Sequence, residues 1–470
     1  MAKVSFHGAA REVTGSMHVV EADGKLIALD CGMFQGRRAE STEKNKRFDL
    51  PAKSLHAVVL SHAHIDHCGR LPLLVKQGFS GRIYATPATR DLCAIMLADS
   101  AHIQQEDANY LNKKRKKNGE GPIEPLYDAD DAVATLRLFQ TASFNTPFWV
   151  AKNTQAKFFE TGHMLGSAGI ELTISEPGRP PLTLVFTGDL GRFNLPILRD
   201  PAPLPACDYL ICESTYGGRA TPTADDLKGQ LEEVITRTFA RNGKVIIPAF
   251  SVGRTQSIVY YIHQLKHEGK IKDLPVFVDS PLSVNATEVF RMHPECYDAD
   301  ARAFQAASGD MLGAGSVKYI SAVEQSKALD RRRGSCVIIS SSGMCETGRI
   351  LHHLKNNVQS GKNTVLIVGY QGANTLGRRI VEREPHIKIF NQRLALKAEV
   401  VVLNGFSGHA DKHELERMTT PLAGRCRRAF LVHGEMDQME KLQATMRGKG
   451  FRSVEMPELG AGFELNGHGG

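Results

Sequence analysis

Residues Ser61 to Gly69 read SHAHIDHCG, and within six positions this stretch places three histidines and one aspartate: His62, His64, Asp66 and His67. The apolar run AVVL at residues 57–60 comes directly before it, so these side chains follow a predicted buried strand. Imidazole nitrogens and carboxylate oxygens are ligands suited to zinc. Four donors this close in sequence cannot all face one tetrahedral ion. The stretch therefore predicts two metal ions side by side, rather than a polar turn with incidental histidines.

Three further predicted strand ends offer ligands. Residues 158–166, FFETGHMLG, place His163 in a glycine-flanked loop, and residues 182–191, LTLVFTGDLG, place Asp189 just past an apolar strand. Each alone is a common turn or cap residue, but with the histidine cluster they complete two coordination shells. The two oxygens of Asp189 can bridge two ions. Asp30 in LIALDCG is either a ligand or a carboxylate that orients a ligand histidine.

The composition is that of an ordinary globular protein. The chain has 470 residues, of which 42% are hydrophobic and 23% are charged, which excludes a disordered chain and leaves room for two or three domains. The sequence contains neither a run of about 18 apolar residues nor the apolar core of a signal peptide. Nine scattered cysteines without a Cys-x-x-Cys pair indicate reduced thiols, so we expect a cytoplasmic protein. The net charge of +7 permits a polyanionic partner without requiring one.

The chain shows two successive patterns. Up to about residue 207, short apolar strands alternate with glycine-rich turns, and the apolar spacing predicts a helix over 87–112. From about 225 to 375, helices and strands alternate, which is typical of a doubly wound parallel sheet. The basic run KKRKK at 113–117 follows the first helix. We interpret this run as a solvated helix end, with a phosphate-binding loop as the alternative.

The ligand pattern resembles that of a known superfamily. The residues His62, His64, Asp66 and His67, followed by His163 and Asp189 with Asp30 upstream, are similar to the zinc-binding pattern of the metallo-β-lactamase superfamily. The resemblance implies a four-layer αββα domain. It also implies that two zinc ions are held, one by His62, His64, His163 and Asp189, and the other by Asp66, His67, Asp189 and His433.

Three downstream motifs resemble the β-CASP branch of that superfamily, which comprises nucleic-acid nucleases. They are Glu213 in ICESTYG, His409 in FSGHAD and His433 in LVHGE. A histidine at 433 resembles the RNA-acting members, and Ala-Asp after His409 resembles the endonuclease subunit of the pre-mRNA 3′-end cleavage factor. With no KH module before the catalytic motifs, the chain resembles a stand-alone prokaryotic RNA nuclease.

The resemblance implies an α/β fold with two domains and a mechanism. Residues 1–207 and 393–470 would form the metallo-β-lactamase domain, and 208–392 an inserted β-CASP domain with a doubly wound parallel sheet. A hydroxide bound by the two metals, with Asp66 among its ligands, would attack phosphorus, and His409, held by Glu213, would protonate the leaving 3′-oxygen. A narrow cleft between the domains would admit single-stranded RNA. We expect mainly endonucleolytic cleavage, with a 5′-exoribonuclease, a small-ester metallo-hydrolase or a silent RNA-binding subunit as alternatives.

RNA binding requires groups outside the metal site. Several glycine-rich loops combine hydroxyls and guanidinium groups that suit phosphate, and the candidates are Ser251, Arg254, Ser341, Ser342, Arg349 and Arg378. A strand-to-helix turn with an arginine facing water is an equal alternative. Aromatic residues total only 7%, so a broad base-stacking platform is not implied. The resemblance also allows a homodimer.

Overall fold

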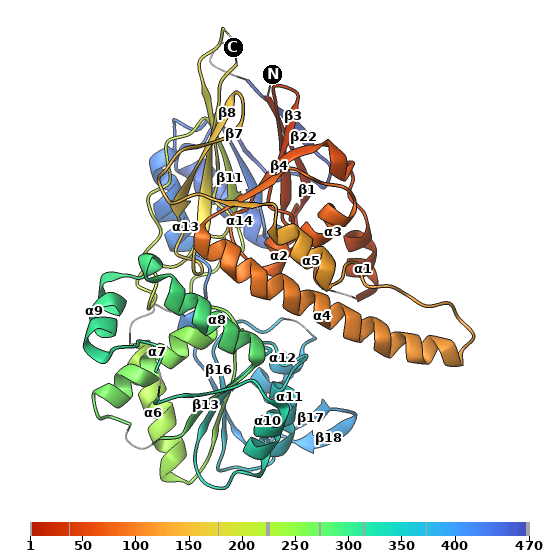
Figure 1. Cartoon of the computed structure of the whole chain (residues 1–470). Coiled ribbons are helices and arrows are strands. Elements are labelled where there is room, and N and C mark those ends of the chain that lie inside the picture. The colour runs from red at the N-terminus through yellow and green to blue at the C-terminus, as the bar shows by residue number, and fades with distance from the viewer. Residues whose placement is uncertain are drawn as a thin grey trace. The chain divides into compact units, whose positions relative to one another are not determined.

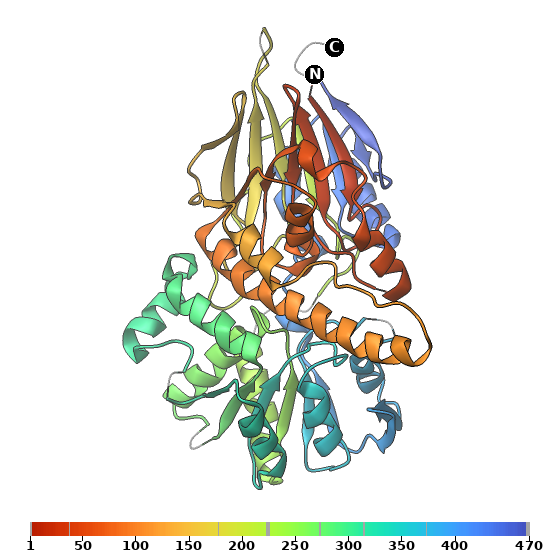
Figure 2. The same cartoon turned by 45° about the vertical axis from the view of Figure 1, so that its right-hand side comes forward.

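The computed structural model describes residues 2–36, 38–176, 178–221, 226–271, 274–313, 315–372 and 374–466. The chain divides into two compact units, seen in Figures 1 and 2, and each is described by itself. Unit 1 contains Met1–Phe193, Asp200–Ala220 and His409–Gly470, and unit 2 contains Asn194–Arg199 and Thr221–Gly408. Among the described residues, no helix combines the length and apolar character that crossing a bilayer requires.

Unit 1 is built on two seven-stranded sheets. The first has the order β22 (Gly462–Leu465), β1 (Ala2–Gly8), β2 (Met17–Ala22), β3 (Lys25–Leu29), β4 (Leu55–Val59), β5 (Arg82–Ala85) and β6 (Phe139–Thr141). The second has the order β21 (Val454–Glu455), β20 (Arg428–Val432), β11 (Tyr209–Glu213), β10 (Leu182–Phe186), β9 (Ala168–Ile174), β8 (Thr154–Glu160) and β7 (Phe148–Ala151). Their inner faces share one core, in which Phe6 and Val59 of the first sheet meet Phe158 and Leu184 of the second. This burial of apolar surface holds the two sheets together.

Helices cover the outer faces of both sheets. On the second sheet, Leu415 of α13 (Lys412–Thr419) and Leu442 of α14 (Met436–Gly448) share a buried cluster with Val185 and Leu431. The helices that follow strands of the first sheet are α1 (Arg38–Lys46), α2 (Ile65–Cys68), α3 (Leu71–Lys76), α4 (Pro87–Lys117) and α5 (Ala129–Leu136), and the short 3-10 turns of the unit are Ala52–Ser54 and Thr420–Leu422. The expected four-layer αββα arrangement is confirmed.

The helix predicted over 87–112 is longer in the structure. It begins at Pro87 after the Thr86 cap and ends at Lys117, so the basic run is helical. Lysine and arginine are good helix formers, and their positive charges are favourable beside the negative end of the helix dipole. The interpretation of 113–117 as a helix end therefore agrees with the structure, and the phosphate-binding loop does not.

Unit 2 contains a six-stranded parallel sheet with helices between its strands. The order is β14 (Lys318–Ile320), β13 (Val276–Asp279), β15 (Val337–Ser340), β12 (Val245–Pro248), β16 (Thr364–Ile367) and β19 (Glu399–Val402). The connecting helices are α6 (Leu227–Ala240), α7 (Arg254–His267), α8 (Pro281–Met292), α9 (Ala299–Ser308), α10 (Val323–Arg331), α11 (Ile350–Asn357) and α12 (Leu376–Val381), with the hairpin β17 (His386–Ile389) and β18 (Gln392–Ala395) and the 3-10 turns Pro294–Cys296 and Asn404–Phe406. The central strands are buried along their whole length, as in sheets covered on both faces. The expected doubly wound sheet is confirmed.

The unit boundaries differ from the expected divisions at 207/208 and 392/393. Residues 208–220 lie in unit 1 because β11 pairs with β10 and β20. Residues 393–408 lie in unit 2, where β19 pairs with β16. The short segment Asn194–Arg199 also lies in unit 2, because Leu198 forms a β-bridge with Tyr297. Strand pairing sets these boundaries, and it is not visible in composition.

Candidate metal centre

The predicted ligands gather at strand ends of unit 1. In both sheets, several neighbouring strands run parallel, namely β3 to β6 in the first and β10, β11, β20 and β21 in the second. Parallel strands bring their carboxyl ends to one edge, where loops can aim side chains at a common point. His62 and His64 follow β4, Asp66 and His67 lie in α2, His163 lies between β8 and β9, Asp189 follows β10, and His433 follows β20.

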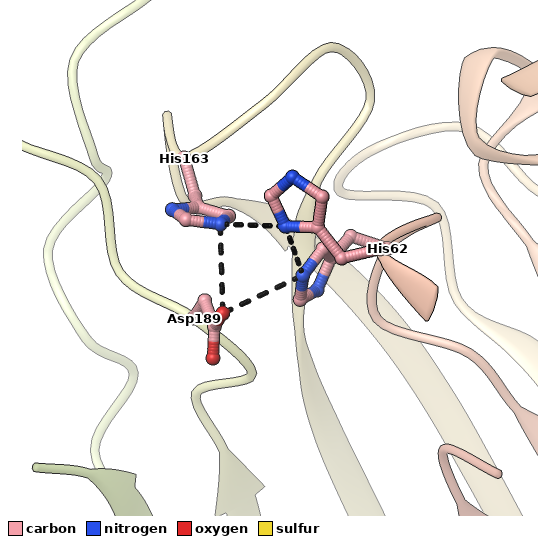
Figure 3. A group of neighbouring side chains, drawn as sticks. His62, His163 and Asp189 are labelled. Carbon is pink, nitrogen blue, oxygen red and sulfur yellow. Dashed lines mark hydrogen bonds and ion pairs between the residues drawn. The ribbon is translucent and has the colours of Figure 1, made fainter. Parts of the chain in front are cut away.

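One group of donors comprises His62, His64, His163 and Asp189, whose ligand atoms lie within 4.8 Å of one another. Nδ1 of His64 lies 3.2 Å from Nε2 of His62 and 3.1 Å from Nε2 of His163. Oδ2 of Asp189 lies 3.5 Å from Nε2 of both His62 and His163. Figure 3 shows His62, His163 and Asp189 pointing toward one another.

A second group comprises Asp66, His67 and His433. Nε2 of His433 lies 3.2 Å from Nε2 of His67 and 3.4 Å from Oδ2 of Asp66. The other oxygen of Asp189, Oδ1, lies 3.4 Å from Nε2 of His67 and 3.5 Å from Nδ1 of His433. One oxygen of the Asp189 carboxylate therefore faces each group.

The donors are arranged as cation ligands rather than as hydrogen-bond partners. Three ring nitrogens, from His62, His64 and His163, converge on one another, and no assignment of one proton to each contact leaves all three neutral rings well paired. Oδ1 of Asp189 is buried and has no hydrogen-bond partner among the described residues. A buried, unpaired carboxylate oxygen is costly unless a cation neutralises it. The residues present therefore fit a metal ion.

Electrostatics put these groups in the protonation states that metals require. Burial, followed by the positive charge available on His67, holds the pKa of His62 well below its usual value, so its imidazole is neutral. Burial alone would raise the pKa of Asp189, but the surrounding histidines outweigh it and hold that pKa well below its usual value. A neutral imidazole and an ionised carboxylate are the forms that bind a divalent ion.

Asp30 supports the centre from behind. Its Oδ2 accepts a hydrogen bond from Nδ1 of His67 at 2.7 Å, and its Oδ1 accepts one from the backbone N–H of Ser61 at 2.7 Å. The bond to Nδ1 leaves Nε2 of His67 facing the cluster. Of the two roles that the sequence left open for Asp30, its position is that of the orienting carboxylate. The adjoining Gly32 is also required, because a Cβ there would lie 1.6 Å from the carbonyl oxygen of Asp66.

His409 and Glu213 form a separate pair beside the metal ligands. Nδ1 of His409 lies 3.3 Å from both carboxylate oxygens of Glu213 and 3.9 Å from Oδ2 of Asp189. Glu213 is fully buried, and its Oε1 accepts a hydrogen bond from the backbone N–H of Leu190 at 2.6 Å. Burial favours a neutral His409, but Glu213 and then Asp189 outweigh it and raise the pKa of His409 to about 9. His409 is thus held as a proton donor whose side chain is 22% exposed.

The predicted phosphate-binding residues of unit 2 divide into two sets. The hydroxyl of Ser280 lies 2.9 Å from the hydroxyl of Ser341 and 3.4 Å from that of Ser251, so these residues are gathered at strand ends. The hydroxyl of Ser342 accepts hydrogen bonds from the backbone N–H groups of Glu346 and Thr347, which fixes its own loop.

The arginines of that set are engaged differently. Arg349 donates to the buried Asp279 at 2.6 Å, and Arg378 donates to Glu382 at 2.6 Å. The guanidinium of Arg254 lies over the ring of Phe406, 5.7 Å from its centroid. Arg349 is therefore committed to a buried ion pair, whereas Arg378 remains a surface residue.

The sequence reasoning missed two supporting residues. Thr215 places its hydroxyl 3.1 Å from Nδ1 of His433, and His353 donates to Asp279 at 2.7 Å inside unit 2. Thr215 lies two residues after Glu213 in ICESTYG, so that motif carried the signal. The buried pair of His353 and Asp279 had no local signal, because its members lie 74 positions apart.

Comparisons with known proteins agree across three stretches of the chain. Residues 10–135 match the family described as metallo-beta-lactamase superfamily, and residues 255–380 match the family described as Beta-Casp domain. Residues 393–457 match the family described as Zn-dependent metallo-hydrolase RNA specificity domain.

Curated relatives resemble this chain over almost its full length. A ribonuclease of Thermus thermophilus is 34% identical over 97% of this chain and 99% of its own. A transcription termination factor, FttA, of Methanosarcina mazei is 30% identical over 92% of this chain and 67% of its own. An RNase J-like protein of Methanocaldococcus jannaschii is 28% identical over 93% of this chain and 94% of its own. A solved structure of a protein of unknown function from Enterococcus faecalis shares the fold, with a TM-score of 0.54 and 14% identity over 99% of this chain and all of its own.

Proposed function

We infer that this chain, which belongs to the β-CASP branch of the metallo-β-lactamase superfamily, is a metal-dependent hydrolase that cleaves RNA. The observation that carries the inference is the position of Asp189, which presents one oxygen to each of two histidine groups. The 34% identity with a ribonuclease over nearly the whole of both chains supports RNA as the substrate. The coarse assignment needs no further detail of the site.

The finer assignment is a pair of zinc ions. His62, His64, His163 and Asp189 would hold one, and Asp66, His67, Asp189 and His433 would hold the other. When bound, two zinc ions lower the pKa of a water molecule toward neutrality and offset negative charge on the phosphate oxygens. The buried, hydrogen-bonded positions of these ligands fix their geometry before substrate arrives.

His409 is our candidate for the general acid. The leaving 3′-oxygen of a ribose is a poor leaving group unless it is protonated as the phosphodiester breaks. Glu213 holds Nδ1 of His409, so the opposite nitrogen, Nε2, is the one available to donate a proton. The products would carry a 5′-phosphate and a 3′-hydroxyl.

We propose single-stranded RNA as the form that is cut, mainly at internal positions. In unit 2, Ser251, Ser341 and Ser342 remain our candidates for holding phosphates, with Arg254 and Arg378 beside them. Arg349 becomes the weakest of the six, because Asp279 already neutralises it. The homodimer that occurs in the family is a separate proposal, which sedimentation velocity of the purified chain would test.

The test is cleavage of 5′-labelled single-stranded RNA by the zinc-loaded chain, with Asp189→Ala as the control. We expect internal fragments from the wild type and none from the variant, which should also lose its zinc. Release of mononucleotides alone would identify a 5′-exoribonuclease instead. Turnover of a small ester without any cleavage of RNA would refute the proposal.

A further inference from the structure

The distal end of α4 forms a basic projection on unit 1. Figures 1 and 2 both show α4 as a single long helix whose C-terminal end extends beyond the sheets of unit 1. Its last five residues, Lys113 to Lys117, are all basic, and they lie at successive positions of a regular helix. Side chains at such positions are spread around the whole helix axis. The end of α4, residues 113–117, is called the basic tip below.

Three lysines of the basic tip lack acidic partners. Lys113, Lys116 and Lys117 are exposed, and among the described residues no carboxylate lies within ion-pair distance of them. Elsewhere the surface lysines are commonly paired, as Lys157 is with Glu171 at 2.7 Å. The other two residues of the basic tip are engaged, because Arg115 pairs with Glu120 and Lys114 lies over the ring of Tyr110.

Helix stability alone does not account for this concentration of charge. One or two basic residues in the last turn suffice to complement the helix dipole, an effect worth about 0.3–1 kcal/mol that falls off within that turn. Five consecutive positive charges also repel one another, which costs part of that stabilisation. Three unpaired lysines within five positions instead form a surface complementary to a polyanion.

The other end of α4 is fixed to the metal centre. The hydroxyls of Thr86 and Thr89 donate hydrogen bonds to the carbonyl oxygen of Gly166, at 2.7 and 2.9 Å. Gly166 lies in the loop that carries His163. A helix rises about 1.5 Å per residue, so the basic tip stands roughly 40 Å from that loop. One rigid element therefore joins the cleavage site to the basic tip at a fixed distance.

We propose that the basic tip binds the phosphate backbone of the RNA substrate at a distance from the cut, and so favours long RNA over short RNA. This proposal rests on the proposed ribonuclease function for the identity of the polyanion. At about 3.4 Å per nucleotide of a stacked strand, roughly 12 nucleotides span the distance between His163 and the basic tip. Shorter RNA can occupy the metal centre but cannot reach the basic tip at the same time.

The test compares two triple variants of the full chain. Lys113→Gln, Lys116→Gln and Lys117→Gln together neutralise the basic tip. The matched control neutralises three exposed lysines elsewhere on unit 1, by Lys3→Gln, Lys25→Gln and Lys152→Gln. Both triple variants change the net charge equally and leave every proposed metal ligand in place.

Binding is measured by fluorescence anisotropy with labelled RNAs of about 5 and 30 nucleotides, lengths that lie well below and well above the roughly 12-nucleotide span. A chelator is present, so that cleavage does not interfere. For the long RNA we expect the basic-tip variant to raise the Kd about 10- to 100-fold at about 0.1 M salt, and to lower the slope of log Kd against log salt by about 2. For the short RNA, and for the control variant with either RNA, we expect changes below about threefold.

Equal losses in the two triple variants, or equal losses with the two RNA lengths, would overturn the proposal, because they would show a general effect of charge. This outcome is distinct from failure of the proposed function. If the metal-loaded wild type cleaved neither RNA, the ribonuclease assignment would fail, while the binding comparison would still decide whether the basic tip holds RNA.

Discussion

At the scale of single residues, each polar group around the metal centre has a distinct task. Asp189 presents an oxygen to each histidine group, Asp30 orients His67, and Glu213 holds His409. These carboxylates are all buried, where a charge is tolerated only with compensating partners. Changing one of them should therefore affect one function more than the others.

His409 is the residue whose removal should separate chemistry from metal binding. His409→Ala should keep the metal content of the wild type and lower the rate of RNA cleavage by about 100- to 10,000-fold, the usual worth of a positioned proton donor. Elemental analysis and single-turnover cleavage would measure the two effects.

An activated aryl phosphodiester supplies the sharper control for His409. Its phenolate leaves without protonation, so His409→Ala should slow its hydrolysis far less than it slows RNA cleavage. If the variant lost its metal, or slowed both substrates equally, His409 would not be the general acid.

Asp30 should govern metal affinity without contacting the metal. In Asp30→Asn, an amide replaces the oxygen that accepts from Nδ1 of His67, so the orientation of that imidazole is no longer fixed. We expect metal affinity to fall by about 10- to 100-fold, as for other residues that support ligands. Asp49→Asn is the matched control, because Asp49 lies near His7 on the surface, 3.7 Å away. Equal affinities in Asp30→Asn and wild type would contradict this role.

At the scale of elements, strand ends decide where chemistry can occur. In unit 1 the carboxyl ends of parallel strands carry the ligands, and in unit 2 the corresponding ends carry Ser251, Ser280 and Ser341. Unit 2 also contains a buried ion pair between β13 and α11, in which His353 donates to Asp279 at 2.7 Å. This pair has a consequence for stability that depends on pH.

Burial opposes the charge of His353, but hydrogen bonds to Asp279 and Asp330 outweigh burial and raise its pKa above the usual 6.5. A histidine whose pKa is raised by folding contributes stability that is complete below pH 6.5 and is lost as pH rises through the folded-state pKa. His353→Gln should therefore destabilise unit 2 by about 3 kcal/mol near pH 6 and by clearly less near pH 9. Denaturant unfolding at the two pH values would measure this, and equal losses would show that His353 is neutral in the folded chain.

At the scale of the whole molecule, the chain has separate cores and one metal centre. Every candidate metal ligand, together with His409 and Glu213, lies in unit 1, and a separate apolar cluster surrounds the parallel sheet of unit 2. A ligand that binds only the folded form stabilises it by about 2.7 kcal/mol at a hundred times its Kd. Metal binding should therefore act on the folding of unit 1.

Calorimetry with and without a chelator would test this separation. We expect removal of the metal to lower the unfolding temperature of one transition, and His353→Gln to lower that of the other. If one perturbation shifted both transitions together, the two units would unfold as a single cooperative structure.

Local sequence was sufficient to predict the features that depend on neighbours along the chain. The ligands His62, His64, Asp66 and His67 lie within a single turn, so their type and spacing alone indicated a metal site. The central strands of both units were predictable because a buried strand is a short apolar run wherever it occurs. The basic run at 113–117 was predictable as a helix end, although the extent of α4 was not.

Tertiary structure decided the features that depend on distant partners. The side chains of His409 and Glu213 meet across 196 positions, and Asp279 engages Arg349 across 70, so no local pattern could show that the first pair forms or that the second arginine is occupied. The unit boundaries followed from the pairing of β11 and β19, which depends on the strands beside them. Residue type fixes what a side chain can bind, but only the fold brings distant side chains close enough to bind together.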